Sequence, residues 1–237
     1  MDRLLKSQLK RVSKQVVEIG GAILIRGDCK EVLPVLKGHY DAIITDPPYG
    51  IGYNPSSTYR GKWKDVKGIV GDDKPFDPSH LLGLVDTVVL FGANHYASRL
   101  PNSRRWFVWD KRPGMKSMSF ADCELAWCSV PGPARMIRYV WSGANRGEER
   151  GQHWHPTQKP VAVMRQIIEV VTKPGDTILD PYMGSGTTGV AALQARCGFI
   201  GVEVEDIWFG ASKRRLSAQA THPPIKSSAS QRSQNAS

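Results

Sequence analysis

Short apolar runs recur along the chain and are separated by stretches rich in glycine, proline and charged residues. Apolar runs of roughly 4–8 residues between turn residues are typical of buried strands. The runs in this chain predict strands at residues 22–26, 42–45, 87–91, 106–109, 124–130, 136–140, 177–179 and 199–204.

A different apolar spacing lies between some of these runs. From Val161 to Val171 the apolar residues fall on one face of a helix, and a second helical pattern runs from Thr187 to Arg196. Strands that alternate with helices predict an α/β fold, with a mostly parallel sheet and helices on both of its faces.

The same pattern suggests how the chain is organised. We expect a single α/β domain over residues 19–216, preceded by a basic lead-in at 1–18 that could form a helix. The Ser-, Gln-, Ala- and Pro-rich residues 217–237 predict a disordered tail. Residues 131–152 are rich in glycine and arginine and break the α/β alternation, so they resemble a short insertion, and residues 53–78 predict a long polar loop.

Charge indicates the kind of partner. The chain has 237 residues and a formal net charge of +10, from 32 Lys and Arg against 22 Asp and Glu. Such an excess favours a polyanion. Aromatic residues and glycines lie among the basic residues at 59–64, 104–106, 111–116 and 135–146, a mixture that suits phosphate contact and base stacking. A nucleic acid is therefore the expected partner.

Other classes of protein are disfavoured. No stretch approaches the roughly 18 apolar residues of a membrane span, and the N-terminus lacks the apolar segment of a secretory signal, so we expect a cytoplasmic protein without membrane contact. The 4 cysteines form no Cys-x-x-Cys pair, and His153 and His155 have no further ligands at a spacing that zinc uses. We expect no metal site.

A glycine loop near the C-terminus predicts a nucleotide-type ligand. A predicted strand ends in Asp180, Gly184 and Gly186 then turn the chain, and Thr187 opens a helix whose free N–H groups can face a ligand. The loop lacks the Gly-Lys-Ser/Thr ending of an ATP-binding P-loop. The next strand ends at Glu203, at the distance from the loop where an acidic residue typically binds ribose hydroxyls.

A second motif lies at the end of another predicted strand. Asp46, Pro47, Pro48 and Tyr49 follow the apolar run at 42–45. The prolines fix the backbone and remove two N–H donors, so the turn presents carbonyl oxygens and the Asp46 carboxylate. These acceptors suit an exocyclic amino group, and Tyr49 can stack on a planar base.

The order of the motifs resembles that of a known family. Asp46–Tyr49 comes first, then the block His155–Pro160, then the loop Asp180–Thr188. This looks like the circularly permuted, or β, class of DNA amino-methyltransferases that use S-adenosylmethionine (SAM), over roughly residues 20–215. The resemblance implies a Rossmann-like, doubly wound methyltransferase fold in which the catalytic half precedes the cofactor half.

The resemblance also implies roles for residues. Asp46 and the Pro47 carbonyl would bind the target amino group, Tyr49 would stack on the extruded base, and the strand at 109–111 would lie near the target pocket. Glu203 would hold the ribose of SAM. The predicted catalytic motif is Asp46, Pro47, Pro48 and Tyr49. The predicted SAM-binding residues are Asp28 and Cys29 near the adenine, His155, Thr157, Lys159, Tyr182, Gly184 and Gly186 at the methionine end, and Asp180, Ser185, Thr187 and Glu203.

The family includes two chemistries on DNA bases. An aspartate at the first motif position is commoner in adenine-N6 enzymes, so adenine in DNA is the expected substrate, with cytosine-N4 methylation as the alternative. A non-catalytic DNA-binding protein, an RNA methylase and a protein-glutamine methylase stay open as weaker alternatives. No Pro-Cys pair occurs, which disfavours ring-carbon methylation of cytosine. Recognition sequence, oligomeric state (a homodimer is one option) and role in restriction–modification, regulation or phage defence are left open.

Overall fold

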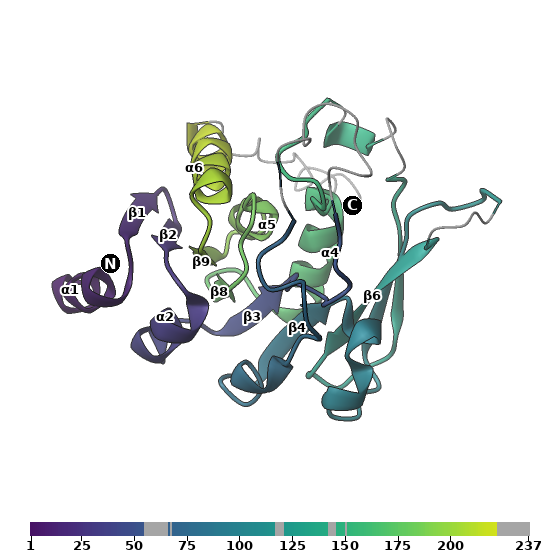
Figure 1. Ribbon diagram of the computed structural model, residues 1–237. Coiled ribbons are helices and arrows are strands. Elements are labelled where there is room, and N and C mark those ends of the chain that lie inside the picture. Colours follow the sequence, from purple (N-terminus) through teal and green to yellow (C-terminus); the bar gives the residue numbers. More distant parts are fainter. Residues whose placement is uncertain (55–65, 67, 117–120, 142–145, 150, 222–237) are drawn as a thin grey trace, which may run out of the picture.

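The computed structural model describes residues 1–54, 66, 68–116, 121–141, 146–149 and 151–221, through which one mixed sheet runs (Figure 1). Within these ranges the sheet is 9-stranded, in the order β1-β2-β9-β8-β3-β4-β6-β5-β7. The strands are β1 (Gln15–Ile19), β2 (Ala22–Arg26), β3 (Ala42–Thr45), β4 (Thr87–Phe91), β5 (Trp106–Asp110), β6 (Cys123–Cys128), β7 (Arg135–Arg138), β8 (Thr177–Asp180) and β9 (Gly198–Glu203).

Parallel pairing dominates this sheet. The strands β2, β9, β8, β3 and β4 run in one direction, whereas β6 is antiparallel to β4 and β5, and β1 is antiparallel to β2. At the far edge, β7 pairs in parallel with β5. The predicted mostly parallel α/β sheet is confirmed. The carboxyl ends of its central strands meet along one edge, where sheets of this kind bind ligands.

Helices cover both faces, as the sequence predicted. On one face lie α4 (Val161–Val171), α5 (Thr187–Gln194) and α6 (Asp206–Thr221), and on the other lie α1 (Arg3–Val12) and α2 (Cys29–Leu36). Because successive strand residues point to opposite faces, Ile44 joins the core beneath α4 while its neighbour Ile43 joins the core beneath α2. Short 3-10 turns are η1 (Pro78–His80), η2 (Ala93–His95), η3 (Ala97–Arg99) and η4 (Gly147–Glu149).

The N-terminal lead-in is part of the sheet's edge. The helix expected there is present as α1, whose first turn is capped by the Asp2 side chain accepting a hydrogen bond from the Leu5 N–H. The expected boundary between residues 18 and 19 falls inside β1, a strand that the sequence did not predict. Its residues are half-buried or exposed because it is the edge strand, so they lack the apolar run of the inner strands.

The C-terminal boundary also differs from the prediction. Helix α6 continues to Thr221, so residues 217–221 are helical rather than disordered. Ser, Ala and Gln are compatible with a helix that packing has already started. Residues 222–237 of the predicted tail lie outside the described residues, as do parts of the predicted loop at 53–78 and of the predicted insertion at 131–152. The described part of that insertion contributes β7.

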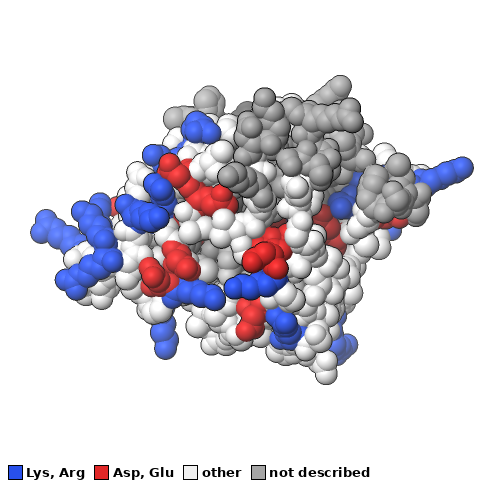
Figure 2. All heavy atoms as spheres, in the orientation of Figure 1, with Lys and Arg blue, Asp and Glu red and all other residues white. Residues whose placement is uncertain are grey.

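Charged side chains are unevenly spread over the surface. On the face drawn in Figure 2, Lys and Arg gather at the α1 end of the molecule, and carboxylates lie nearer the middle. The exposed basic residues of that end include Arg3, Lys6, Lys10, Arg11 and Lys14. None of the helices in the described ranges combines the length and apolarity of a transmembrane segment.

Candidate active site

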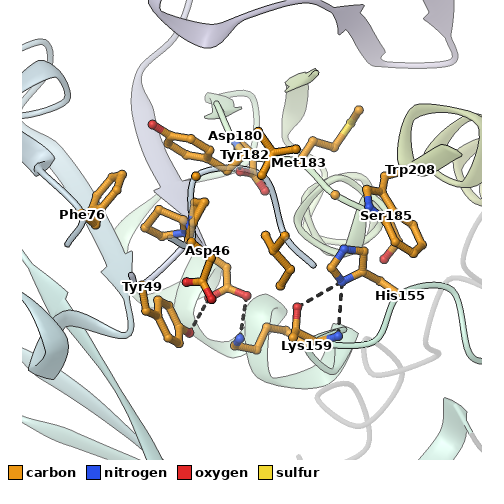
Figure 3. A pocket seen from close by; sticks show the side chains of 18 of the residues that line it. Asp46, Tyr49, Phe76, His155, Lys159, Asp180, Tyr182, Met183, Ser185 and Trp208 are labelled. Atoms are coloured by element: carbon orange, nitrogen blue, oxygen red, sulfur yellow. Dashed lines mark hydrogen bonds and ion pairs between the residues drawn. The ribbon is translucent and has the colours of Figure 1, made fainter. Parts of the chain in front are cut away.

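A cavity of about 720 Å³ opens at the carboxyl ends of the central strands (Figure 3). Its walls come from the segments that follow β2, β3, β8 and β9, together with the block at 153–160. A volume of this size is typical of sites for small molecules and cofactors. The topology explains its position, because parallel neighbours deliver their following loops to the same edge.

Two distant motifs are joined at the floor of this cavity. Strands β3 and β8 are parallel neighbours, and the Thr45 hydroxyl donates a hydrogen bond of 2.6 Å to Asp180 Oδ1. Both side chains are buried. Asp46 and Asp180 therefore start from adjacent positions on the sheet, although the motifs that contain them are far apart in sequence.

The structure brings nearly all predicted site residues to this one cavity. Gly186 is the exception: it caps α5 with a left-handed backbone (φ 80°), and a Cβ there would press on Ser212 of α6. The predicted residues that line the cavity are Asp28, Cys29, Asp46, Pro47, Pro48, Tyr49, His155, Thr157, Lys159, Asp180, Tyr182, Gly184, Ser185, Thr187 and Glu203.

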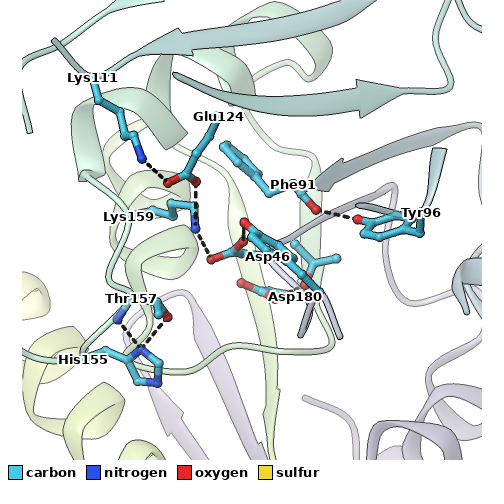
Figure 4. Close-up of polar contacts among 11 residues, drawn as sticks. Asp46, Phe91, Tyr96, Lys111, Glu124, His155, Thr157, Lys159 and Asp180 are labelled. Carbon is cyan, nitrogen blue, oxygen red and sulfur yellow. Dashed lines mark hydrogen bonds and ion pairs between the residues drawn. The ribbon is translucent and has the colours of Figure 1, made fainter. Parts of the chain in front are cut away.

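Asp46 has both carboxylate oxygens engaged. Oδ1 accepts a hydrogen bond of 2.5 Å from the Tyr49 hydroxyl, and Oδ2 lies 2.5 Å from Lys159 Nζ (Figure 4). Burial raises the pKa of Asp46, and the Lys159 ammonium acts against that rise. The Asp46 side chain keeps 22% of its surface exposed, so it remains accessible from the cavity.

Lys159 is the centre of a chain of alternating charges. Its Nζ lies 2.5 Å from Asp46 and 3.1 Å from Glu124 Oε2, while Glu124 Oε1 lies 3.1 Å from Lys111 Nζ (Figure 4). Burial lowers the pKa of Lys159, but the carboxylates of Asp46 and Glu124 outweigh this and hold it above the usual value. Burial likewise works against the ionised form of Glu124, but the two lysines hold its pKa below the usual value. Only Lys159 was predicted as a site residue.

The Tyr49 ring is packed tightly at the mouth of β4. It stacks on His95, with ring centroids 5.2 Å apart and planes at 16°. Gly92 lies directly beneath it with a left-handed backbone (φ 65°), and a Cβ at this position would collide with the ring. A side chain in place of Gly92 would therefore displace the tyrosine.

The chain after this motif is held by Asp72. Its Oδ1 accepts a hydrogen bond of 2.7 Å from the Gly50 N–H, and its Oδ2 accepts one of 2.6 Å from the Tyr53 N–H. Asp72 is 3% exposed. This buried carboxylate fixes the turn that presents Asp46 and Tyr49, a role that the sequence did not indicate.

The glycine loop faces the other end of the cavity. Glu203 accepts hydrogen bonds of 2.8 Å from the backbone N–H groups of both Gly184 and Glu205. Burial raises the pKa of Glu203 to about 7 and that of Asp180 to about 6. Gly184 has a left-handed backbone (φ 51°), and a Cβ there would meet only the His155 ring at 4.0 Å. The loop backbone is therefore open to close approach by a ligand.

Aromatic and polar side chains surround Tyr182, which occupies a place where phenylalanine is common in the family. Its hydroxyl lies 2.9 Å from His80 Nε2, and its ring meets Phe76 edge-on at 5.6 Å. Burial lowers the pKa of His80, so its ring is neutral at pH 7. Asp28, predicted near the adenine, accepts a hydrogen bond from the Lys30 N–H and so caps α2.

His155 is a neutral, packed side chain. Its Nδ1 accepts a hydrogen bond of 3.2 Å from the Thr157 N–H, and its ring meets Trp208 edge-on at 4.2 Å. Burial lowers the pKa of His155 to about 3. Within the part of the chain that the structure describes, no three His, Cys, Asp or Glu residues are grouped as metal ligands.

A buried ion pair lies behind the glycine loop. Arg215 of α6 is paired with Glu149 at 2.7 Å, and donates a hydrogen bond of 2.7 Å to the Thr187 hydroxyl. Glu149 also accepts hydrogen bonds from Gln158 Nε2 and from the Val161 N–H. This cluster joins the predicted insertion to the block at 153–160 and to the start of α5.

Comparisons with known proteins agree with this geometry. Residues 106–212 match the N6/N4 methyltransferase family model described as DNA methylase. The chain is 29% identical to the type II methyltransferase M2.LlaDCHI of Lactococcus lactis subsp. cremoris, covering 89% of this chain and 95% of that protein. It is 33% identical to M2.DpnII of Streptococcus pneumoniae, covering 50% of this chain and 44% of that protein.

Solved structures give the same result. The M1.HpyAVI–SAM complex superposes with a TM-score of 0.53 at 26% identity, covering 84% of this chain and 99% of that one. The cytosine-N4-specific PvuII DNA methyltransferase shares the fold, with a TM-score of 0.59 at 14% identity, over 85% of this chain and 93% of that one. The chain therefore belongs to the N6/N4 family of DNA amino-methyltransferases.

Proposed function

We propose that this protein transfers a methyl group from SAM to the exocyclic N6 of adenine in DNA. The observation that carries the proposal is the pair of adjacent strand ends in one cavity. Asp46 with its two prolines follows β3, and the open glycine loop follows β8. One end offers acceptors for an amino group, and the other offers backbone and a carboxylate for a cosubstrate.

The residues of the glycine-loop end fit SAM. The loop at Gly184 leaves room for a ligand beside the backbone, Glu203 presents a carboxylate to ribose hydroxyls, and the aromatic wall at Tyr182 suits a planar adenine. SAM supplies an electrophilic methyl group on a sulfonium centre. The M1.HpyAVI structure contains SAM, which supports the same cosubstrate here. We assign Asp28, Cys29, His155, Thr157, Tyr182, Gly184, Ser185, Thr187 and Glu203 to this site, with Asp180 and Gly186 shaping the loop.

At the other end, acceptors would act on the base. The lone pair of an exocyclic amino nitrogen is delocalised into the ring, so the nitrogen is a poor nucleophile. Hydrogen bonds from its two N–H groups to the Asp46 carboxylate and the Pro47 carbonyl favour a pyramidal nitrogen with its lone pair directed outward. These acceptors also stabilise the positive charge that develops on nitrogen before it loses one proton. Holding two reactants in line supplies up to about 7–11 kcal/mol in favourable cases.

The base must leave the duplex to reach this cavity. An extruded base stacks on an aromatic ring in enzymes that act on bases, and Tyr49 is positioned for this by Gly92 and His95. Sequence reading is assigned to residues 131–152 together with the loop at 53–78. The M2.LlaDCHI and M2.DpnII relatives are type II methyltransferases, which supports a role in modifying DNA within a restriction–modification system.

Mass spectrometry of nucleosides, after incubation of DNA with SAM and the protein, tests the proposal. We expect N6-methyladenine, formed at a short sequence motif. N4-methylcytosine alone would contradict the adenine assignment while retaining the family chemistry. Absence of any methylated base on varied DNA substrates would contradict the enzymatic proposal.

Replacement of the motif aspartate is the matched variant. Asp46→Ala removes an acceptor from the reacting end without touching the glycine loop, so we expect a loss of at least ~10²–10³-fold in transfer rate. SAM affinity, measured by calorimetry, should stay within about threefold of the unmodified protein. Near-normal methylation by Asp46→Ala would overturn the assigned mechanism.

A further inference from the structure

The ammonium of Lys159 occupies the place on Asp46 that a target amino group would need. Lys159 Nζ is an N–H donor 2.5 Å from Asp46 Oδ2, and the other oxygen of that carboxylate accepts from the Tyr49 hydroxyl. Lys159 belongs to the block that was predicted to flank the methionine end of SAM. Its charged end instead reaches the predicted base-binding motif, as Figures 3 and 4 show.

A second carboxylate holds the same ammonium from behind. Glu124 Oε2 on β6 lies 3.1 Å from Lys159 Nζ, and Lys111 Nζ neutralises the other oxygen of Glu124 at 3.1 Å. The Phe91 and Tyr49 ring centroids lie 5.7 Å and 5.5 Å from the ammonium, within cation–π range. Lys159 is 6% exposed, so carboxylates and aromatic faces replace most of the water around its charge.

A purely structural role accounts poorly for this arrangement. A buried ion pair is weak evidence for stability, because the desolvation of two charges offsets much of their attraction. This pair moreover lines the cavity at the reacting end, where Asp46 is still 22% exposed. Without Lys159, the carboxylates of Asp46 and Glu124 would lie in one poorly solvated region with only Lys111 nearby, and two such carboxylates tend to share a proton.

We propose that Lys159 is a positioning residue for the base-binding carboxylate. It keeps Asp46 ionised, and it holds Oδ2 in place until the amino group of the extruded base takes over that oxygen. Glu124 then retains the lysine, so the ammonium stays beside Asp46 rather than leaving the cavity. The inference rests on the proposed function for the identity of the incoming amino group, but the ionisation of Asp46 can be measured without substrate.

The pH dependence of single-turnover methylation tests this role. Lys159→Met removes the charge and retains an unbranched apolar side chain. Loss of a neighbouring opposite charge raises a carboxyl pKa by about 1–3 units, so the acid limb of the rate profile should move to higher pH by that amount. At pH 7 the rate should fall by roughly 10–100-fold and recover in part above pH 8, since each unit changes the ionised fraction tenfold.

Two variants serve as controls. Lys159→Arg keeps the charge and should leave the acid limb within about half a pH unit, because the guanidinium still favours the ionised Asp46. Lys111→Met removes a cation that pairs with Glu124 but does not touch Asp46, so its profile should move much less. SAM affinity of Lys159→Met should stay within about threefold of the unmodified protein.

Several results would overturn the inference. One is an unmoved acid limb in folded Lys159→Met or, where that variant does not fold, in Lys159→Gln. Another is a tenfold loss of SAM affinity with a normal rate at saturating SAM, which would return Lys159 to the cosubstrate site. Carbon-13 NMR titration of the Asp46 carboxyl gives a readout independent of methylation: an unchanged midpoint in the variant contradicts the inference even if the proposed reaction fails.

Discussion

The two ends of the cavity use carboxylates in opposite ways. At the base end, Asp46 and Glu124 share the buried ammonium of Lys159. At the cosubstrate end, Asp180 and Glu203 are held by hydroxyl and backbone N–H donors, and no ion pair involves either of them among the described residues. Burial raises the pKa of Glu203 to about 7 and that of Asp180 to about 6.

This difference suits the two ligands. An amino group that becomes positively charged during reaction requires an ionised acceptor, so a cation that opposes protonation of Asp46 is useful there. SAM carries its own positive charge, and a lysine inside the loop would repel it. The cosubstrate end does have a buried cation, Arg215, but its guanidinium contacts Glu149 and the Thr187 hydroxyl behind the loop.

The largest effect is expected from breaking that hidden pair. Arg215→Met leaves the Glu149 carboxylate buried without its cation, and removal of one partner of a buried ion pair typically costs about 3–5 kcal/mol. Urea unfolding measures the loss. The surface pair Arg165–Glu169 is the control, since its side chains are 47% and 54% exposed and Arg165→Met should cost less than about 0.5 kcal/mol. Equal costs would mean that Arg215 does not support the loop.

An intermediate effect is expected from Glu203, and it depends on pH. Because the pKa of Glu203 rises from 4.5 to about 7 on folding, the protonated form stabilises the folded protein. This contribution is fully present below pH 4.5 and is lost as the pH rises through about 7, for a total of up to roughly 3 kcal/mol.

Glu203→Gln should therefore flatten the fall in melting temperature between pH 5 and 8 in the SAM-free protein. The glutamine amide also leaves one backbone N–H poorly paired, so the variant should be less stable at low pH by about 1–3 kcal/mol. The slope against pH is the diagnostic quantity, and a slope equal to that of the unmodified protein would contradict the burial argument. Asp180, whose pKa is raised in the same direction, is unchanged in both proteins.

The smallest effect is expected at Tyr182. Tyr182→Phe loses the hydrogen bond to His80 and keeps the ring against Phe76, so the free energy of unfolding should fall by about 0.5–1.5 kcal/mol. SAM affinity should change less than about threefold, since phenylalanine is common at this position in the family. Tyr182→Leu removes the ring as well and should cost more in both measurements. A large loss of affinity in Tyr182→Phe would show that the hydroxyl itself contacts the cosubstrate.

The sequence predicted the inner strands well because each carries a short apolar run between turn residues. It missed β1, whose residues Gln15–Ile19 are partly exposed at the sheet edge and so carry no such run. The local motifs were also predictable, because Asp46–Tyr49 and Asp180–Thr188 are contiguous in sequence. Their arrival at one cavity follows from the pairing of β3 with β8, which a parallel sheet allows but a sequence does not specify.

Long-range partners were beyond prediction. The contact between Lys159 and Asp46 spans 113 residues, and Glu124 lies in a strand otherwise chosen for its apolar residues. A carboxylate within such a run was the one local signal that a buried partner was needed, because a charge on an inner strand is rarely left unpaired. Arg215 gave no comparable signal, since basic residues are common on helices such as α6.

The hydrogen bond between Thr45 and Asp180 has a consequence for how the protein becomes active during synthesis. It closes a separation of 135 residues, so β8 leaves the ribosome on the order of ten seconds after β3 at ordinary elongation rates. Strand pairings between such distant segments form late, because loop closure must precede the contacts that reward it. A nascent chain that already displays Asp46–Tyr49 has no floor beneath that motif, and the reacting groups come together only in the completed chain.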